Sequence, residues 1–427
     1  MKNYFETPVE KTKEGRELST VAHAPTTQFY QRGLGLKQEV KEILKKEYYS
    51  DLVAYLRNHG HKFTAGGVTV HLAKEFGFCY GVDRAVDYAY QTREKFPDRR
   101  IFITGEIIHN PHVNNRLLEI GIQFLSGQYS DGTTHDDLQE DDVVILPAFG
   151  VSIQEFQTLK AKGCILVDTT CGSVLNVWKR VEFYAKNSYT SVIHGKYFHE
   201  ETIATSSQAL KHPDGKYLVV RNMEEARRVC DYIVQGGDKR EFMKYFEKST
   251  SSNFDPDSDL TKIGIANQTT MLSTESLAIA DELKKAMVRK FGAECIKEHF
   301  ETFDTICSAT QERQDAVVEL VNDQNLDLMV VIGGFNSSNT NHLADITSKH
   351  TKTYHIDDPA CILDAEKIRH KRVGTRDIVV SSDWLPSKDC AIGITAGAST
   401  PNNKIGEVIE KIMRYRGIAV EGLLNGL

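Results

Sequence analysis

From residue 68 onward, short runs of apolar residues alternate with segments in which apolar positions recur every three or four residues. The runs have the length of strands, and the segments between them have the period of amphipathic helices. One such helical stripe consists of Val174, Val177, Trp178 and Val181. Alternation of this kind is typical of parallel strands covered by helices. The sequence therefore predicts an α/β fold with mainly parallel sheets.

The alternation of strands and helices starts again after Cys171 and after Cys307, with a similar order of elements. This weak repetition predicts three pseudo-equivalent α/β lobes arranged around a shared central site. The predicted lobes cover residues 67–170, 171–306 and 307–398. A polar N-terminal extension at 1–66 precedes them, and a C-terminal helix and tail at 399–427 follows.

Three polar segments interrupt or precede the lobes. Within the extension, apolar residues at helical spacing predict one helix over residues 38–60. The segments at 238–260 and 365–389 are polar and rich in charged residues. Such segments usually lie at the surface, so both are predicted to be surface insertions.

The composition of the 427 residues, with 40% hydrophobic and 26% charged side chains, is ordinary for a soluble globular enzyme. A net charge of -7 argues against a nucleic-acid partner, which would require a basic face. No run of apolar residues is long enough to cross a membrane. Residues 1–18 lack the apolar core of a signal peptide, and their four glutamates do not suit an acid-poor transit peptide. We therefore expect a cytoplasmic protein, without a nucleic-acid or membrane partner.

Three of the eight cysteines, Cys79, Cys171 and Cys307, stand where an apolar run gives way to a helical pattern. The positive end of a helix favours the thiolate form of a cysteine. Three thiolates predict an iron-sulfur centre, because a 4Fe-4S cluster held by three cysteines keeps one iron open to substrate. Electron-transfer ferredoxins usually hold all four irons. Zinc is less favoured, since closely spaced ligand pairs are absent.

The remaining five cysteines lie in or beside apolar runs and are predicted to be small buried hydrophobic residues. They are Cys164, Cys230, Cys295, Cys361 and Cys390.

Polar turns follow several of the predicted strands, at the edge where ligands gather in α/β proteins. Their side chains include His109, His194, His199, Glu201, Thr269, Ser337, Ser338, Asn339 and Ser399. The turn after Gly333 and Gly334 and the turn at Ser399–Pro401 are candidate sites for a diphosphate. The alternative is that their hydroxyls only cap helices, with Pro401 at the first helical position. Likewise, His199 and Glu201 either act chemically or only stabilise a helix start.

The motifs GFCYGVDRA, EIIHN, DTTC, HEET, NQTTM, NSSNTN and TAGAST occur in this order along the chain. With these motifs the chain resembles the 4-hydroxy-3-methylbut-2-enyl diphosphate reductase family over about Val68 to Met413. The resemblance extends to its plant and cyanobacterial form through LPAFG, VIHGKYFHEETIAT and GIANQTTML. Because no transit peptide is evident, a bacterial source is expected.

The resemblance implies three lobes around one 4Fe-4S cluster, with Cys79, Cys171 and Cys307 as its ligands. It implies that Glu201 delivers a proton and that the hydroxyl of Thr269 supports it. Residues implied to bind the diphosphate are His109, His199, Ser337, Ser338, Asn339 and Ser399.

The implied reaction is the reductive dehydroxylation of 4-hydroxy-3-methylbut-2-enyl diphosphate to isopentenyl and dimethylallyl diphosphate, the last step of the methylerythritol phosphate pathway. The substrate alcohol would bind the open iron, and ferredoxin or flavodoxin would supply the electrons.

Two positions depart from the family. Phe149 replaces a histidine found in several bacterial members, and Gly172 replaces a proline. We hypothesise that His194 compensates in part for the lost histidine.

Two other functions are compatible with these residues. A non-redox hydratase or dehydratase would also use a cluster with an open iron, but it would need no reductant. A cluster-carrying electron-transfer module would need neither Glu201 nor a diphosphate site. An assay with and without a reductant distinguishes among the three.

Overall fold

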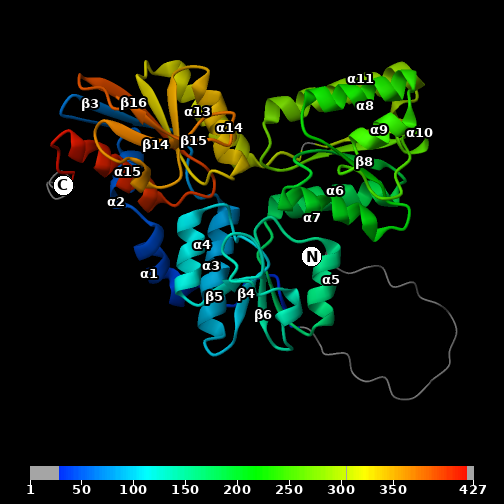
Figure 1. The fold of residues 1–427 in the computed structure, drawn as a ribbon, viewed down its shortest axis with the longest axis horizontal. Helices are drawn as coiled ribbons and strands as arrows, with labels where there is room; N and C mark the ends of the chain where they lie inside the picture. The colour runs from blue at the N-terminus through cyan, green and yellow to red at the C-terminus, as the bar shows by residue number, and fades with distance from the viewer. Residues whose placement is uncertain (1–27, 304, 421–427) are drawn as a thin grey trace. The chain divides into compact units, whose positions relative to one another are not determined.

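The computed structural model describes residues 28–303 and 305–420 (Figure 1). The chain forms two compact units, which are described separately below. Of the described residues, the first unit comprises 28–33, 96–105 and 122–306, and the second comprises 34–95, 106–121 and 307–420. Parts of the predicted N-terminal extension (1–27) and C-terminal tail (421–427) lie outside the described residues.

The first unit contains two parallel sheets. In one, the strand order is β1 (Phe29–Tyr30), β7 (Ile165–Asp168), β6 (Val143–Leu146), β4 (Ile101–Ile103) and β5 (Ile122–Phe124). In the other, the order is β11 (Phe300–Thr302), β10 (Ile263–Asn267), β8 (Thr190–His194) and β9 (Tyr217–Val220). All strand pairs are parallel. Strands such as β6 and β8 are buried along their whole length, as expected for sheets covered on both faces.

Helices cover both faces of the second of these sheets. Figure 1 shows α8 and α11 on one face and α6 and α7 on the other. Val177 and Val181 of α6 pack into a buried cluster with Ile193. The Tyr184 hydroxyl donates to the Ile265 carbonyl at 2.8 Å. The helices of the unit are α5 (Ile153–Ala161), α6 (Gly172–Lys186), α7 (Glu200–Ser207), α8 (Met223–Gln235), α9 (Lys239–Tyr245), α10 (Pro256–Asp259), α11 (Ser273–Phe291) and α12 (Ile296–His299). Two 3₁₀ turns are η1 (His135–Asp137) and η2 (Gln208–Lys211).

The second unit is built on one mixed sheet. Its order is β15 (Ile378–Ser382), β14 (Lys367–Lys371), β13 (Lys352–Ile356), β12 (Leu328–Ile332), β16 (Cys390–Ala396), β3 (Val68–Leu72) and β2 (Lys62–Ala65). The four central strands are parallel, and the edge pairs are antiparallel. The helices are α1 (Lys37–Tyr48), α2 (Asp51–Asn58), α3 (Tyr80–Lys95), α4 (Pro111–Glu119), α13 (Ser308–Asp323), α14 (Ser338–Ser348) and α15 (Asn402–Tyr415), with the 3₁₀ turn η3 (Pro359–Cys361).

The central strand β12 has a buried core on each of its faces. Leu328, Val330 and Ile332 pack with α2 and α15, whereas Met329 and Val331 pack with α13 and α14. This division follows from the alternation of side chains along a strand. The prediction of an α/β fold with mainly parallel sheets is confirmed. The structure also has helices before β2, in the region predicted as a helical extension.

Strand β3 pairs in a different sheet from the one that its position in the sequence suggests. The sequence analysis reads this strand as the start of the first lobe, but β3 pairs in parallel with β16 in the sheet of the second unit. Pairing between strands more than 300 positions apart cannot be inferred from local periodicity, which reports only the buried face of each element.

The single helix predicted over residues 38–60 is wrong, because the structure has two helices there. Tyr49 and Ser50 adopt extended backbone conformations between α1 and α2. The hydroxyl of Ser50 accepts a hydrogen bond from the Val53 N–H at 3.3 Å and so caps α2.

The two segments predicted as surface insertions contribute to the cores instead. The first contains α9 and α10, and its buried residues Phe242, Phe246 and Phe254 join the core of the second sheet. The second forms the antiparallel strands β14 and β15, and Trp384 after them is buried. The few large apolar residues decide the packing, although charged residues outnumber them locally.

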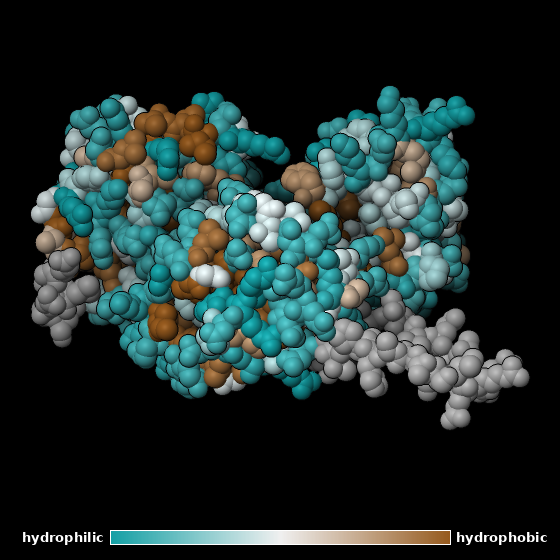
Figure 2. Space-filling model, turned by 60° about the horizontal axis from the view of Figure 1, so that its bottom comes forward, coloured by the Kyte–Doolittle hydropathy of each residue, from teal (hydrophilic) through white to brown (hydrophobic). Residues whose placement is uncertain are grey.

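None of the described helices is both long and apolar enough to cross a membrane. Figure 2 shows hydrophilic residues over most of the face that it draws, with apolar residues in smaller groups. Scattered exposed apolar residues are normal at a protein surface and carry no further conclusion.

Candidate active site

The three cysteines predicted as cluster ligands each stand at the start of a helix. Cys171 in the first unit occupies the N-cap position of α6, and Cys307 in the second occupies that of α13. Cys79, also in the second unit, directly precedes α3. All three are half-buried, and no disulfide joins any of the eight cysteines, all of which are described. Each thiol therefore lies where the helix dipole favours a negative charge.

The backbone turn before Cys171 is fixed by hydrogen bonds. The Cys171 N–H donates to the Ala148 carbonyl at 2.8 Å, and the Thr169 hydroxyl donates to the Leu146 carbonyl at 2.6 Å. The Thr170 N–H donates to the carboxylate of Asp168 at 2.9 Å. These contacts hold the turn at the carboxyl end of β7, where α/β sheets bind ligands.

In the second unit, Arg313 of α13 ties the segment before Cys79 to the helix that begins after Cys307. Its guanidinium is buried and donates to the carbonyls of Gly77 (2.7 and 3.1 Å) and Phe78 (3.2 Å). It also donates to the carbonyl of Ala309 at 2.7 Å. The guanidinium reaches these carbonyls with three separate nitrogen atoms in one plane, whereas a lysine ammonium has all its donors on a single nitrogen. Arg313, to which the sequence analysis assigned no role, is thus a positioning residue for both cysteine turns.

We expect Arg313→Lys to remove some of the hydrogen bonds that hold the two cysteine turns. Carbonyls left without a donor each cost about 1–3 kcal/mol when buried, so the free energy of unfolding should fall by a few kcal/mol. Iron retained after gel filtration should fall on the order of tenfold, as for other residues that orient metal ligands. Chemical denaturation and iron analysis test this. The exposed Arg414→Lys of α15 is the control, and equal behaviour of the two variants would contradict the role of Arg313.

Four of the five cysteines predicted as buried are buried: Cys164, Cys230, Cys361 and Cys390. Burial raises the pKa of Cys164 to about 11 and that of Cys230 to about 12, so both stay protonated at neutral pH. The prediction is wrong for Cys295, which is half-buried. Cys295 follows the end of α11 at Gly292 and lies in a turn, where the chain does not enter the core.

In the first unit, Glu201 is held in a buried position at the start of α7. The carboxyl group is 2% exposed, and the Thr269 N–H donates to its Oε1 at 2.5 Å. His199 occupies the N-cap position of α7, and its Nδ1 accepts from the Glu201 N–H at 3.2 Å. The structure thus brings together His199, Glu201 and Thr269, all from turns that follow β8 and β10. For His199 the capping role is realised, through the hydrogen bond from the Glu201 backbone N–H.

Gln268 organises this group, although the sequence analysis assigned it no role. Its Oε1 accepts from the Lys196 N–H and from the Thr202 hydroxyl, both at 3.2 Å, and its Nε2 donates to the Thr270 hydroxyl at 2.8 Å. The side chain therefore joins the turn after β8 to the turn after β10. The available signal was a polar residue directly after a buried strand, in the motif NQTTM.

Phe149 and His194 lie in the same unit. The ring of Phe149 is nearly buried and lies 6.3 Å from that of His199, edge to face at 74°. His194, at the end of β8, is buried, and its Nδ1 is 2.8 Å from the Ser276 hydroxyl of α11. Burial lowers the pKa of His194 to about 4, so its imidazole is neutral at physiological pH.

The lowered pKa of His194 predicts a pH dependence of stability. In the unfolded chain the pKa is about 6.5, so between that pH and about 4 the unfolded state binds more protons. The contribution is therefore complete above about pH 6.5 and is lost as the pH falls toward 4. We expect His194 alone to lower the free energy of unfolding by about 2 kcal/mol between pH 8 and pH 5. Urea titrations of the wild type and His194→Asn measure this, and parallel pH profiles would contradict it.

The second unit holds the other predicted substrate contacts. The Nδ1 of His109 is 2.9 Å from the carboxylate of Glu106, and the Asn336 amide donates to the same carboxylate at 3.0 Å. Hydrogen bonds of this kind fix the orientation and the tautomer of an imidazole. The sequence analysis missed Glu106, although it stands in the motif EIIHN that also contains His109.

The backbone at His109 is approached closely by two turns. The Ser399 hydroxyl donates to the His109 carbonyl at 3.1 Å. A Cβ atom at Gly334 would lie 2.4 Å from the same carbonyl oxygen, so only glycine fits there. The hydroxyl of Ser399 does not cap a helix, because α15 begins at Asn402. Pro401 holds its N-cap position and not the first helical position, which corrects the prediction for this turn.

Ser337, Ser338 and Asn339 open α14 and are all at least 95% buried. The Ser337 hydroxyl caps the helix by accepting from the Thr340 N–H at 3.3 Å, as the alternative reading predicts for this turn. The side-chain Oδ1 of Asn339 accepts from the Ala398 N–H at 2.9 Å. The carbonyl of Ala398 in turn accepts from the Cys79 N–H at 3.2 Å. These bonds link the helix start to the turn of Cys79.

The sequence model of the LytB protein family matches residues 70–413, from within β3 to within α15. The chain belongs to the LytB family. A relative from Thermosynechococcus vestitus, named 4-hydroxy-3-methylbut-2-enyl diphosphate reductase, is 50% identical over 392 residues, which cover 92% of this chain and 96% of the relative. A relative of the same name from Gloeothece citriformis is 49% identical over 389 residues, with coverage of 91% and 95%.

Solved structures of LytB-like enzymes share the fold. One, described as (E)-4-hydroxy-3-methyl-but-2-enyl diphosphate reductase, the terminal enzyme of the non-mevalonate pathway, is 26% identical with a TM-score of 0.50. The match covers 81% of this chain and 99% of the chain in that structure. Another, described as E-1-hydroxy-2-methyl-but-2-enyl-4-diphosphate reductase from Plasmodium falciparum, is 23% identical with a TM-score of 0.57. The match covers 80% of this chain and 86% of the other chain, and it supports the fold alone.

Proposed function

We propose that this chain is an iron-sulfur reductase that converts 4-hydroxy-3-methylbut-2-enyl diphosphate into isopentenyl and dimethylallyl diphosphate. The observation that carries the proposal is the buried carboxyl group of Glu201, held by the Thr269 N–H in a chain about half identical to reductases of this substrate. A buried acid at the start of a helix, fixed by a backbone donor, suits proton transfer to a leaving oxygen.

The thiols of Cys79, Cys171 and Cys307 are proposed to hold a 4Fe-4S cluster. Their chemistry fits, because each is half-buried at a helix start, unlike the four cysteines that lie in the cores. When bound, such a cluster supplies electrons and an iron that can act as a Lewis acid. Three protein thiolates for four irons is the feature that distinguishes this site from an electron-transfer ferredoxin.

Glu201 is proposed to give a proton to the substrate hydroxyl, so that the oxygen leaves as water. The backbone N–H of Thr269 keeps the carboxyl group in one orientation, and the Thr269 hydroxyl is proposed to lie beside the substrate alcohol. In the balanced reaction the allylic C–O bond breaks, a C–H bond forms, and two electrons and two protons are consumed. Protonation at one or the other end of the allylic unit gives the two products.

The diphosphate is proposed to be bound by hydrogen-bonding groups that are neutral or nearly so. These are the side chains of His109, His199, Ser337, Ser338, Asn339 and Ser399. Glu106 orients the imidazole of His109, and the start of α14 adds the positive end of a helix dipole. Such groups orient an anion by hydrogen bonds without a cluster of lysines.

The role of His194 as a substitute for the missing histidine stays a prediction. If its neutral imidazole contributes to substrate binding, His194→Ala should raise the KM for the substrate several-fold at constant kcat. Ser276→Ala removes its 2.8 Å hydrogen-bond partner but keeps the imidazole, and so serves as the control. An unchanged KM in His194→Ala would rule the role out.

The test of the proposed function is an anaerobic assay of the reconstituted protein with the substrate, with and without dithionite and methyl viologen. Turnover that requires the reductant and yields both isoprenoid diphosphates is expected. Conversion without a reductant would favour a hydratase or dehydratase. A cluster that is reduced and reoxidised without any conversion would favour an electron-transfer module. The physiological reductant is proposed to be ferredoxin or flavodoxin.

A further inference from the structure

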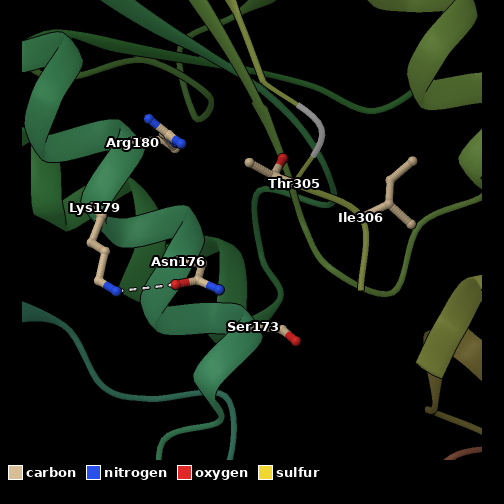
Figure 3. A pocket seen from close by; sticks show the side chains of 6 residues that line it. All are labelled: Ser173, Asn176, Lys179, Arg180, Thr305 and Ile306. Carbon is tan, nitrogen blue, oxygen red and sulfur yellow. Dashed lines mark hydrogen bonds between the residues drawn. The ribbon is translucent and has the colours of Figure 1, made fainter. Parts of the chain in front are cut away.

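A polar pocket of about 420 Å³ lies beside α6 in the first unit. The residues that line it are Ser173, Asn176, Lys179, Arg180, Thr305 and Ile306 (Figure 3). The Lys179 ammonium donates to the Asn176 side chain at 3.1 Å, and the Arg180 guanidinium lies 3.5 Å from the ring centroid of Phe303. The basic side chains of this pocket are therefore engaged by neighbours within the unit. In the second unit, by contrast, a basic side chain supports a turn of the candidate active site.

That turn, residues 333–337 between β12 and α14, is fixed at its start by a buried histidine. Nε2 of His355 donates to the Gly333 carbonyl at 2.9 Å. The His355 ring also meets the ring of Phe335 edge to face, with centroids 5.3 Å apart. Burial lowers the pKa of His355 to about 4, so its imidazole is neutral at physiological pH. His355 therefore holds the start of the turn with a donor that does not titrate near neutral pH.

The middle of the turn is held by Lys371 of β14, in the segment that was predicted to be a surface insertion. The Lys371 ammonium donates to the Phe335 carbonyl and to Oδ1 of Asn341, both at 2.7 Å. Nδ2 of Asn341 donates to the same Phe335 carbonyl at 3.1 Å and to the Ser337 carbonyl at 2.7 Å. The lysine and the asparagine thus bind each other and share one carbonyl. Through this contact a strand near the edge of the sheet supports the turn proposed to bind the diphosphate.

The orientation of the Phe335 carbonyl determines where the next backbone donor points. The peptide between Phe335 and Asn336 is trans, so its N–H points opposite to its C=O. With the carbonyl held as described, the Asn336 N–H points away from the two side chains that hold it. The Asn336 side chain donates at 3.0 Å to the Glu106 carboxylate, which is 2.9 Å from Nδ1 of His109. A rotated peptide would therefore displace a backbone donor and a neighbour of a proposed diphosphate contact together.

We propose that Lys371 and Asn341 are positioning residues for the diphosphate, because they hold the Phe335 peptide in the orientation that binding requires. The proposal rests on the proposed function and deepens it by assigning a role to the segment at 365–389. A turn that is fixed before the substrate arrives loses less conformational entropy on binding. The diphosphate does not react, so it is bound alike in the ground state and in the transition state. Loss of this support should therefore weaken binding and leave the chemical step unchanged.

The experiment compares Lys371→Met, Asn341→Ala and the double variant with the wild type. It measures kcat and the KM for the substrate, and it titrates the reconstituted holoenzyme with inorganic pyrophosphate. Each single variant should raise the KM and the Kd for pyrophosphate on the order of tenfold, with kcat within about twofold of the wild type. Because both side chains act through one carbonyl, the double variant should raise them by clearly less than the product of the two single effects. Lys367→Met, at the exposed other end of β14, is the control and should behave like the wild type.

These measurements separate positioning from a general loss of structure. Partial misfolding lowers the amount of active protein, and with it the apparent kcat, but it leaves the KM and the Kd of the folded fraction unchanged. An unchanged KM and Kd in Lys371→Met overturns the proposal. An equal rise in Lys367→Met, or a double-variant effect equal to the product of the single effects, overturns it as well.

A failure of the proposed function would look different. The wild type would then bind pyrophosphate more tightly than Lys371→Met does, but it would convert no substrate with dithionite and methyl viologen. That outcome would support the positioning of a diphosphate by Lys371 while ruling out the proposed reaction.

Discussion

Glu201→Gln should lower kcat by on the order of 10²- to 10⁴-fold, with little change in the KM for the substrate. The amide keeps the shape of the carboxyl group, and its oxygen can still accept the hydrogen bond from the Thr269 N–H, which is 2.5 Å from Glu201 Oε1. It cannot give a proton to a leaving oxygen. Loss of kcat at constant KM is the signature of an interaction that acts in the transition state.

The matched control for this variant is its neighbour. Glu200 stands in the same first turn of α7 but is exposed, whereas Glu201 is buried. Glu200→Gln therefore removes the same charge near the same helix end, without touching the proposed proton donor. A comparable loss of kcat in both variants would mean that the helix dipole, and not the proton, accounts for the effect. Thermal unfolding of the two proteins checks that both remain folded.

The sequence predicted individual elements best where the apolar pattern and the residues typical of helix ends indicated the same boundaries. Residues 223–235 have the apolar period of an amphipathic helix, and they form α8, Met223–Gln235. Its start is capped by the Asn222 side chain, and Gly236 ends it with a positive φ of 72°. Local hydrogen bonds and backbone conformation determine such boundaries, so a single sequence contains the necessary information.

Features that depend on distant contacts were not predictable in this way. The partner of β3 is β16, and the polar segment at 365–389 becomes an edge of the same sheet. Neither fact is encoded in the local alternation of polar and apolar residues. The same holds for side chains that orient others, such as Arg313 and Gln268, whose partners come from separate turns. Their roles become visible only when the hydrogen bonds are known.

The candidate site was predictable only in part. Motifs located its polar turns, but they left open whether each hydroxyl caps a helix or binds a ligand. Ser337 does cap α14, whereas Ser399 donates to the backbone of His109. A cap and a ligand contact are not exclusive, because the start of a helix offers N–H groups to both a side chain and an anion. The residue type alone therefore could not decide between them.

Cys171→Ser should abolish the 4Fe-4S cluster and with it the activity. A serine hydroxyl is not deprotonated at neutral pH and is a poor ligand for iron in such clusters, where thiolates are used. Substitutions of residues that only orient metal ligands already cost about 10- to 100-fold, so loss of a ligand should lower reductant-dependent turnover on the order of a hundredfold or more. Iron and sulfide content and the visible absorption of anaerobically reconstituted protein measure the cluster directly.

The informative control is Cys295→Ser, because Cys295 is also half-buried and also precedes a short helix, α12. It should keep its cluster and its turnover. Exposure and helix position are similar in the two cysteines, so a difference between the variants would reflect ligation and not general thiol chemistry. If Cys171→Ser reconstituted with full iron and sulfide content and an unchanged absorption spectrum, the assignment of Cys171 as a ligand would have to be abandoned.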